Sequence, residues 1–433
     1  MQRLAATVAR PLLLTAGFAV VMALGATAAQ PQPQPARNSA PGPLSTESAG
    51  RLPSFAAVAQ PGSYSQLYGD TCAARSDCWA VGFYLKTGDA ALGQVLHLHQ
   101  ETWSPVSVPQ PGSRRGTGYD YLQGVACSSA RDCWAVGYYR ARTKASLNEM
   151  LHWNGRRWRR VRAPQPAGTT RRNDQNQLNA VTCISASNCW AVGSFAKTGS
   201  GSVNETLHWN GRKWATVAAP NPSGTASGEE NVLYGVFCTS RRHCLAVGDG
   251  RGSAGAYVNE ALLWNGRKWA KLRPPQPGGT SAHGYSYLEG IYCLSASDCW
   301  AAGGYYDPTH QYLNEALKWN GRKWRQVPTP DPGFGWGGSE LNSVACVARS
   351  DCWAVGNYYS RKGVRNETLR WNGKRWSQMP TSQPGGRGAR THTLYGISCR
   401  SRSDCWAVGY LFNRTGAPRD EVLRWDGRRW AKG

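Results

Sequence analysis

Short runs of alternating apolar and polar positions recur along most of the chain, and each unit of 53 to 56 residues contains four of them. In the second unit these runs cover 122–127, 134–139, 149–153 and 158–162. Alternation with a period of two is typical of a β-strand with one buried face. No segment with a helical period competes with this pattern, so each unit is predicted to form four strands.

A hairpin signal separates the third run from the fourth. Asn154-Gly155 occupies this place in the second unit, and Asn-Gly or Asp-Gly recurs there at 210, 265, 320, 372 and 426. Both residues tolerate the positive φ of a tight turn. A two-residue turn would place Leu151 opposite Trp158 and Trp153 opposite Arg156, whereas a three-residue loop with a bulge would shift this pairing.

A four-stranded sheet that carries large apolar groups must be covered, and neighbouring copies are the available cover. Seven such sheets close a ring. We therefore predict an all-β, seven-bladed β-propeller with four-stranded antiparallel blades. Residues 55–61 match the fourth-strand pattern of 158–164 but precede the first unit. We expect this N-terminal strand to complete or extend the last blade as a latch.

Each unit carries two cysteines six residues apart, and none is left over. Zinc ligands usually lie two to four residues apart with partners nearby, so disulfides are favoured over metal sites. Closing so short a loop stabilises the fold by about 2 kcal/mol. The expected bridges, one within each blade, are Cys72 with Cys78, Cys127 with Cys133, Cys183 with Cys189, Cys238 with Cys244, Cys293 with Cys299, Cys346 with Cys352 and Cys399 with Cys405.

From about residue 52 to residue 433 the units resemble the kelch or Asp-box blades of seven-bladed propellers, which occur in secreted bacterial proteins and in glycan-active enzymes. The segment Ala135-Val136-Gly137 has one Gly where kelch blades have two. Asp132 directly precedes Cys133, whereas an Asp-box places its Asp two residues before a Gly. The resemblance implies the propeller architecture, while neither motif is matched fully.

The N-terminal region differs from the repeats. Arg3 and Arg10, an apolar run and a small-residue stretch predict a signal peptide over 1–29. A Pro-, Ala- and Gln-rich linker is expected over 30–50 and the propeller over 51–433. We expect a secreted, extracellular protein without a membrane span.

Basic residues dominate the charge balance. Removing 1–29 takes away two Arg and no acid, so the formal net charge falls from +24 to +22. Such an excess favours anionic partners such as acidic polysaccharides, or serves colloidal solubility alone. Paired cations at 156/157, 212/213, 267/268, 322/323, 374/375 and 428/429 lie in the third-to-fourth turns, on the same end as the disulfides. Solvated turns are favoured over a polymer-binding ring.

Nineteen of the 20 Trp recur at three repeat positions and are interpreted as packing between blades. Trp336 is the exception, and with Phe334 it lies in a Gly-rich segment that could bind a sugar ring or fold onto the rim. A Glu begins the third strand in six units, which argues against a single catalytic acid. We expect these Glu to bond to backbone or Arg, the Asp before each second Cys to stabilise its turn, and the repeated His152 and His208 to be structural.

Variable, long loops occupy the other end of the blades, and function tends to reside on variable loops held by a rigid scaffold. We therefore prefer this end as the binding face. The candidate ligand-binding residues are Phe334, Trp336, Tyr119, Tyr121, Tyr285, Tyr287, Tyr305, Tyr306, Tyr358, Tyr359, Arg114, Arg115, Arg171 and Arg172.

No phosphate-binding loop, G-x-S-x-G elbow or H-E-x-x-H motif is present in the sequence, so no cofactor, metal or catalytic residue is assigned. Two catalytic alternatives stay open. One is a sialidase-like trio of Arg with a Tyr/Glu pair, and the other is a lyase centre around His283, Tyr285 and Tyr287.

The leading hypothesis is a monomeric, non-catalytic protein that binds an extracellular glycan or anionic polymer, without specific recognition of nucleic acid. A glycan-active hydrolase or lyase is the first alternative. An adaptor that binds a protein partner is the second.

Overall fold

The computed structural model describes residues 64–86, 90–112, 118–385, 389–413 and 416–433, and these residues form 28 strands and no helix. Strands consecutive in sequence pair antiparallel, and they build seven blades of four strands each. Parallel bridges additionally join neighbouring blades, between Ser146 and Gln175, between Ala91 and Tyr119 and between Tyr257 and Tyr285. The predicted all-β architecture with four-stranded antiparallel blades is confirmed.

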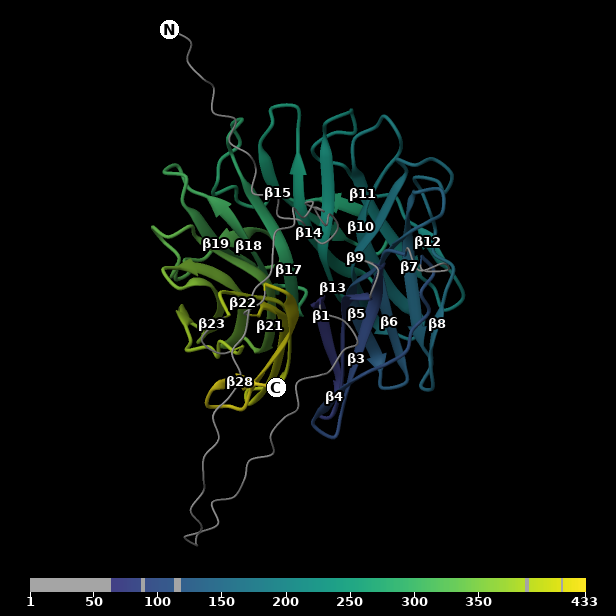
Figure 1. Cartoon of the computed structure of the whole chain (residues 1–433). Helices are drawn as coiled ribbons and strands as arrows, with labels where there is room; N and C mark the ends of the chain where they lie inside the picture. The colour runs from purple at the N-terminus through teal and green to yellow at the C-terminus, as the bar shows by residue number, and fades with distance from the viewer. Residues whose placement is uncertain (1–63, 87–89, 113–117, 386–388, 414–415) are drawn as a thin grey trace, which may run out of the picture. The chain divides into compact units, whose positions relative to one another are not determined.

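The first strand of each blade is the innermost. In Figure 1 these strands gather toward the middle of the sheets, while the fourth strands lie at the periphery. Each first strand contacts those of the two neighbouring blades, and β25 contacts β1, so the seven strands form a closed ring. They are β1 (Tyr64–Ala74), β5 (Asp120–Ser129), β9 (Gln175–Ser185), β13 (Glu230–Ser240), β17 (Ser286–Ser295), β21 (Ser339–Ala348) and β25 (Thr391–Ser401).

The middle strands of each blade carry most of the buried surface. The second strands are β2 (Asp77–Lys86), β6 (Asp132–Arg140), β10 (Asn188–Ala196), β14 (His243–Arg251), β18 (Asp298–Tyr306), β22 (Asp351–Ser360) and β26 (Asp404–Phe412). The third strands are β3 (Ala90–His99), β7 (Ser146–Trp153), β11 (Val203–Trp209), β15 (Tyr257–Trp264), β19 (Tyr312–Trp319), β23 (Gly363–Trp371) and β27 (Pro418–Trp425).

Short edge strands complete the blades. They are β4 (Thr102–Pro105), β8 (Trp158–Arg160), β12 (Trp214–Thr216), β16 (Trp269–Lys271), β20 (Trp324–Gln326), β24 (Trp376–Gln378) and β28 (Trp430–Lys432). The last blade therefore obtains its fourth strand from the C-terminal segment. The expected latch at 51–61, the signal peptide and the linker lie outside the described residues.

The hairpin between the third and fourth strands is longer than the expected two-residue turn. Trp153 pairs with Trp158 and Leu151 with Arg160, which leaves a four-residue loop. The Asn154 side chain explains this length, because its Oδ1 accepts the backbone N–H groups of Arg156 and Arg157, both at 3.1 Å. The predicted pairings of Leu151 with Trp158 and of Trp153 with Arg156 are wrong.

All seven disulfides join the first and second strands of one blade, as predicted. The two cysteines of each bridge are 3.9–4.1 Å apart between Cα atoms and face each other across the strand pair. No cysteine is free. Each bridge therefore closes the hairpin at one end of its blade, and this end is called the disulfide end below. The bonded pairs are Cys72 with Cys78, Cys127 with Cys133, Cys183 with Cys189, Cys238 with Cys244, Cys293 with Cys299, Cys346 with Cys352 and Cys399 with Cys405.

Indole rings fill the joints between blades. Trp353 of β22 is fully buried, and its ring centroid lies 4.6 Å from that of Trp425 and 5.3 Å from that of Trp430 in the next blade. The same three-ring contact joins four other pairs of blades, as with Trp79, Trp153 and Trp158. At the joint of the seventh blade to the first, Trp406 packs on Trp103. The repeated Trp residues are packing groups, as expected.

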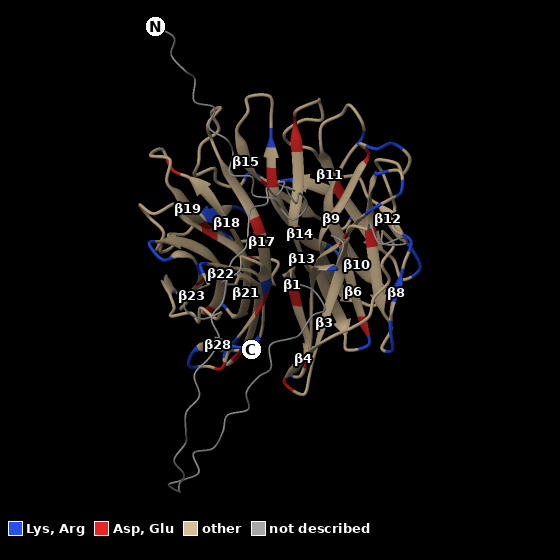
Figure 2. Ribbon diagram, in the orientation of Figure 1, with Lys and Arg blue, Asp and Glu red and all other residues tan. Residues whose placement is uncertain are grey.

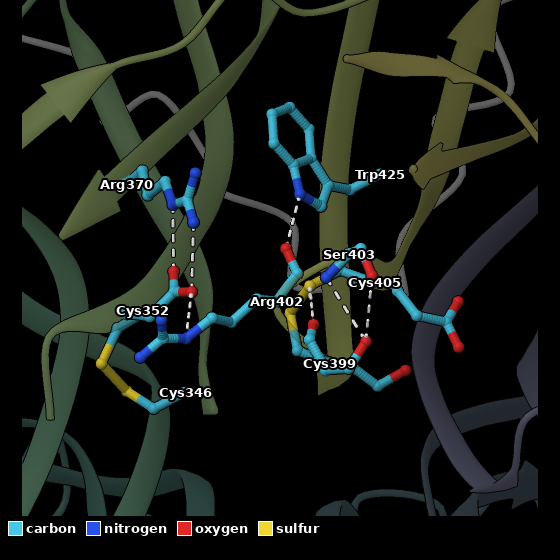
Figure 3. The surroundings of a disulfide bond; sticks show 12 residues. Cys346, Cys352, Arg370, Cys399, Arg402, Ser403, Cys405 and Trp425 are labelled. Carbon is cyan, nitrogen blue, oxygen red and sulfur yellow. Dashed lines mark hydrogen bonds and ion pairs between the residues drawn. A yellow bond between two sulfur atoms is a disulfide. The ribbon is translucent and has the colours of Figure 1, made fainter. Parts of the chain in front are cut away.

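The Asp before the second Cys has a role beyond the predicted stabilisation of its turn, which Asp132 does provide by accepting from Ser128 Oγ. Asp351 accepts two hydrogen bonds from the Arg370 guanidinium, at 3.0 and 3.1 Å, and that guanidinium lies 5.2 Å from the Trp353 ring. Arg402 of the following blade reaches the same carboxylate at 3.7 Å, and its carbonyl accepts the Trp425 indole N–H at 2.9 Å (Figure 3). These Asp residues therefore hold a cation on the indole face and do not simply close a turn.

Histidine takes the place of that cation in the first two blades. His97 and His152 bond to Asp77 and Asp132 at 2.7 and 2.6 Å, and they stack on Trp79 and Trp134. His208 lies at the same place on Trp190, with ring centroids 4.6 Å apart. The structural role expected for His152 and His208 is confirmed.

A belt of amide–carboxyl hydrogen bonds connects the third strands of neighbouring blades. Asn259 Nδ2 donates to Glu315 Oε1 of the next blade at 2.7 Å, and Asn314 to Glu367 at 2.9 Å. Equivalent bonds run from Asn148, Asn204 and Asn366 to Glu205, Glu260 and Glu421. The expected bonds from these Glu residues to Arg or neighbouring backbone are wrong, because the Asn amide of the preceding blade occupies that side.

The belt is inverted where the ring closes. Gln94 replaces Glu in the first blade, and Asp420 replaces Asn in the seventh. Gln94 Nε2 donates to Asp420 Oδ2 at 2.5 Å. In the other bonds of the belt the preceding blade supplies the donor, whereas here the seventh blade supplies the acceptor and the first blade supplies the donor.

A substitution at an indole joint tests this packing. We expect Trp353→Leu to lower the free energy of unfolding by about 3 kcal/mol, because it removes a fully buried ring from contact with two others. The fourth blade already carries Leu245 at this position, so the variant should still fold. Trp336→Leu, at a half-exposed position, is the control and should change the denaturation midpoint little. Equal shifts in both variants would contradict the packing role.

The belt also predicts how stability depends on pH. Burial raises the pKa of Glu205, Glu260, Glu315 and Glu367 well above the usual value, so folding favours their protonated forms. Their contribution to stability is therefore complete below the unfolded pKa of about 4.3 and is lost as pH rises through the folded pKa.

We expect Glu315→Gln, which is permanently neutral, to lose less stability than the wild type as pH rises from about 5 to about 8, the range in which buried carboxyl groups titrate. The denaturation midpoint at each pH measures this. Gln94 shows that the position accepts an amide. Glu101→Gln, at an exposed carboxyl, is the control. A pH dependence identical to that of the wild type would contradict the proposed protonation of the belt.

Candidate functional site

A cluster of tyrosines lies at the end of the fifth and sixth blades opposite the disulfides, which we call the loop end. Tyr287 of β17 and Tyr312 of β19 stack with ring centroids 6.2 Å apart, and their hydroxyls are hydrogen-bonded to each other. Tyr285 and Tyr306 pack against this pair at 5.0 to 6.4 Å. Three of the four, Tyr285, Tyr287 and Tyr306, are predicted candidates that the fold brings together.

One carboxyl group accepts from both phenols. Glu340 Oε2, on β21 of the sixth blade, lies 3.0 Å from the Tyr287 hydroxyl and 3.0 Å from the Tyr312 hydroxyl. Glu340 is 9% exposed, and burial raises its pKa although the phenol hydrogen bonds oppose that shift. Burial and the neighbouring Glu340 carboxyl raise the pKa of both Tyr287 and Tyr312. The three groups thus form a connected hydrogen-bonded unit, called the phenol–Glu340 unit below.

A second carboxyl group lies on the neighbouring inner strand. Glu289 follows Leu288 at a β-bulge of β17, where two residues oppose one on β18. A bulge redirects the side chain of its extra residue, and Glu289 keeps partial contact with solvent. No hydrogen bond of its carboxyl group is recorded within the described ranges. Burial, together with Asp249 and Glu340, raises the pKa of Glu289 to about 8.

Bulges occur at the same place in all seven inner strands. The extra residues differ between blades: Tyr68, Gln123, Asn179, Tyr234, Glu289, Asn342 and Tyr395. Asn179 and Asn342 use their amides to bond the next inner strand, at 2.9 and 2.8 Å to Leu233 and Leu394 carbonyls. Glu289 is the one acidic residue among these seven bulge positions.

Tyr119 and Tyr121 lie in a different aromatic cluster, in the first two blades. Tyr121 packs on Phe83 and Tyr138, with centroids 4.7 and 5.2 Å away. Phe83 in turn stacks on Tyr68, which contacts Tyr395 of the last blade at 5.4 Å. Both clusters lie at the loop end, but among the described residues no ring contact joins Tyr119 or Tyr121 to the phenol–Glu340 unit.

Among the described residues, Phe334 and Trp336 are the most exposed large apolar side chains, at 60% and 50%. They lie in the loop between β20 and β21. The Gly338 carbonyl of this loop accepts the Tyr359 backbone N–H at 2.9 Å, and Gly338 also lies against Tyr312. Trp336 and Tyr358 line one cleft. Tyr359, on the other face of the strand, packs against Gly337. Of the predicted candidates, Tyr359 thus lies against the loop that contacts Tyr312, whereas Trp336 and Tyr358 line the separate cleft.

Several other candidates are not brought to this place. Arg171 and Arg172 are exposed in the connection between the second and third blades. Tyr305 lies on β18 next to Tyr306, with its side chain on the opposite face of the strand. His283 is exposed in the loop before β17, apart from the hydrogen bonds of the phenol–Glu340 unit. Arg114 and Arg115 lie outside the described residues.

The paired cations in the third-to-fourth hairpins are all exposed at the disulfide end. Figure 2 shows such blue loops beside β8 and β28. No ion pair is recorded for these twelve side chains in the part of the chain that the structure describes. The interpretation as solvated turns agrees with this exposure, and the aromatic and acidic groups described above lie at the opposite end.

Sequence reasoning missed Glu289, Glu340 and Tyr312. A signal for Glu289 was present: each inner strand carries Leu followed by a variable residue and then a small one, and a Gly inside a strand often marks a bulge. Tyr312 lies at the start of a third strand and Glu340 near the start of a first strand, at positions that vary between units. Their spacing in the sequence therefore could not show that the two side chains are in contact.

Metal-binding and membrane-spanning features are not found in the described part of the chain. No group of His, Cys, Asp and Glu that could hold a metal ion occurs among those residues. Nor do they include a helix that could span a bilayer.

Solved structures with this fold include glycan-cleaving enzymes. The GH74 xyloglucanase from Xanthomonas campestris is similar with a TM-score of 0.54 at 15% identity, over 87% of this chain and 55% of that enzyme. The polysaccharide lyase Uly1 gives 0.49 at 8% identity, over 85% and 90% of the two chains. An α-L-arabinofuranosidase from Fusarium graminearum gives 0.42 at 10% identity, over 70% and 93%.

No protein-family model matches the chain, and no match to a curated protein sequence was found. The kelch or Asp-box resemblance is therefore supported only as far as the propeller architecture. The present chain spans about half the length of the xyloglucanase.

These comparisons correct the leading functional hypothesis. The chain was expected to be a non-catalytic binding protein, but the similar structure with a TM-score above 0.5 is a xyloglucanase. The non-catalytic hypothesis is therefore replaced by its glycan-active alternative as the function to be proposed.

Proposed function

We propose that this protein is a glycan-cleaving enzyme, a hydrolase or a lyase, that acts by acid–base chemistry at Glu289 and the phenol–Glu340 unit. The observation that carries the proposal is the pair of inequivalent carboxyl groups on adjacent inner strands. Glu289 has a pKa of about 8, while Glu340 accepts two phenol hydrogen bonds. Carboxyl groups in unequal environments provide the acid and the base of such a reaction.

Each group has a defined part in this chemistry. Glu289 is protonated at neutral pH and donates its proton to the departing glycosidic oxygen. Glu340, as carboxylate, takes the proton of a phenol only as the phenol oxygen reacts, because both phenols have raised pKa values. In hydrolysis the phenol oxygen attacks the anomeric carbon as Glu340 takes its proton, and the glycosidic oxygen leaves with the proton of Glu289. Water then attacks the anomeric carbon and gives a proton to Glu289, while the phenol oxygen leaves with the proton held by Glu340. In elimination the phenol oxygen removes a carbon-bound proton as it passes its own proton to Glu340.

Export of the protein belongs to the same proposal. All fourteen cysteines are paired in seven disulfides, and such bridges persist in oxidising compartments. We infer that the protein is secreted and meets its glycan outside the cell.

Substitution of the acid tests the function. Glu289→Gln should lower kcat on a cleaved polysaccharide by about 10²- to 10⁴-fold, since a general acid contributes that much. Tyr312→Phe should lower it similarly, whereas Glu101→Gln and Tyr84→Phe leave it unchanged. The assay measures new reducing ends, which both reactions make, and unsaturated uronate, which only a lyase makes. Absence of cleavage across neutral and acidic polysaccharides, or full activity of Glu289→Gln, would refute the proposal.

The pKa of Glu289 predicts the alkaline limb of the pH–rate profile. Because the reaction needs the protonated acid, kcat/KM should fall as pH rises through about 8. Asp249 helps to raise this pKa, so Asp249→Asn should move the alkaline limb to lower pH. An alkaline limb that stays in place in Asp249→Asn would remove Glu289 from the acid role.

A further inference from the structure

A cleft at the loop end of the sixth blade has a chemistry of its own. It encloses about 580 Å³ and is lined by Trp336, Tyr358, Arg361, Lys362, Arg365 and Gln383, with Pro332 and Ser360. This volume falls within the usual range of ligand sites, about 300–1,000 Å³. The lining includes an exposed indole and three cationic side chains but no acidic residue.

The cations are held in place by the shortest kind of hairpin. Ser360 pairs with Gly363, so Arg361 and Lys362 form a two-residue turn between β22 and β23. Ser360 Oγ accepts the Lys362 backbone N–H at 3.2 Å, and Arg365 Nη2 donates to the Lys362 carbonyl at 3.0 Å. A turn of this kind fixes the backbone at Arg361 and Lys362, so both side chains start from fixed positions at the edge of the cleft.

The indole on the opposite wall is held equally firmly. Trp336 N donates to the Gly333 carbonyl and Gly335 N to Gln311 Oε1, both at 2.9 Å. Gly337 has a φ of 124°, and a Cβ there would lie 3.0 Å from the Tyr359 ring, so only Gly fits this position. The Arg361 guanidinium lies 4.6 Å from the Trp336 ring centre and joins the two walls.

The charge of the cleft is uncompensated. No ion pair of Arg361, Lys362 or Arg365 is recorded within the ranges that the structure describes, and Arg361 and Lys362 are exposed. Guanidinium groups bind carboxylates and sulfates through paired N–H donors, and an indole provides an apolar face for a sugar ring. The Gln383 side chain already bonds to Asn366 N and O at 3.0 and 3.1 Å, so it is not counted among the ligand-binding groups.

We propose that this cleft is a subsite for an acidic sugar unit, carboxylated or sulfated, of the glycan. The inference rests on the proposed glycan-cleaving function and names its substrate class as an acidic polysaccharide. The sugar ring lies against Trp336 while Arg361, Lys362 and Arg365 bind its anionic group. The loop that carries Trp336 also contacts Tyr312 through Gly338, so this loop connects the subsite with the phenol–Glu340 unit.

Calorimetry with matched oligosaccharides tests the subsite independently of cleavage. The protein carries Glu289→Gln to prevent turnover, and the probes are a galacturonate tetramer, its methyl ester, dextran sulfate and dextran. We expect the acid or the sulfate to bind at least about tenfold more tightly than its neutral counterpart, because hydrogen bonds to charged groups are stronger than those between neutral groups. The anionic probe that binds more tightly shows whether the subsite prefers a carboxylate or a sulfate. Equal binding of charged and neutral probes would overturn the proposal.

Variants locate the effect. Lys362→Gln with Arg365→Gln should weaken binding of the anionic probe at least about tenfold and flatten its salt dependence. The matched control is Arg267→Gln with Lys268→Gln, which removes two exposed cations at the disulfide end. Equal weakening in both double variants would mean that net charge alone attracts the probe, and the subsite would be rejected.

The outcomes separate this inference from the proposed function. Charge-selective binding without cleavage of any polysaccharide would retain the subsite and refute the enzyme. Cleavage confined to neutral polysaccharides would retain the enzyme and refute the acidic subsite.

Discussion

The structure depends on burial of an indole of one blade between two indoles of the next. A four-stranded sheet with an apolar face is not stable alone, and here the cover is always the next unit. Trp353, for example, has no exposed surface and touches rings from both outer strands of the seventh blade. The cation or imidazole on its other side, fixed by the Asp before the cysteine, completes the joint. This repeated contact sets the spacing of the blades and therefore positions the inner strands.

Because the joints are satisfied by repeated residues, the inner strands are free to differ at the bulge. The extra residue is Glu in the fifth blade and Asn or Tyr in its neighbours. Its neighbour Glu340, from the sixth blade, meets Tyr287 and Tyr312 from the fifth, so the candidate site is built across a joint and exists only when the two blades are packed. A repeat protein with a single functional site is expected to combine regular blades with one pair of blades that departs from the repeat.

The sequence predicted the fold well because each unit repeats the same signals. The strand alternation, the cysteine spacing and the Asn-Gly turn agree across copies, so one misjudged turn, as at Asn154, does not change the architecture. The site was predicted only in part. Tyr287 and Trp336 stood out as departures from the repeat, whereas Glu340 and Tyr312 are close only after two separate blades pack. The hydrogen bond between Asn259 and Glu315 could not be predicted for the same reason, because it joins two different blades.

The inverted bond between Gln94 and Asp420 has a consequence for assembly. Seven nearly identical units could in principle be exchanged between two molecules, or joined end to end into a longer array. If Asp420 faced a unit with Glu at that position, two carboxyl groups would meet in a buried place, and Gln94 would meet another amide. The mismatch disfavours contact of the seventh blade with any internal blade. The inverted pair therefore specifies that the seventh blade meets a first blade, which sets the order in which the blades close.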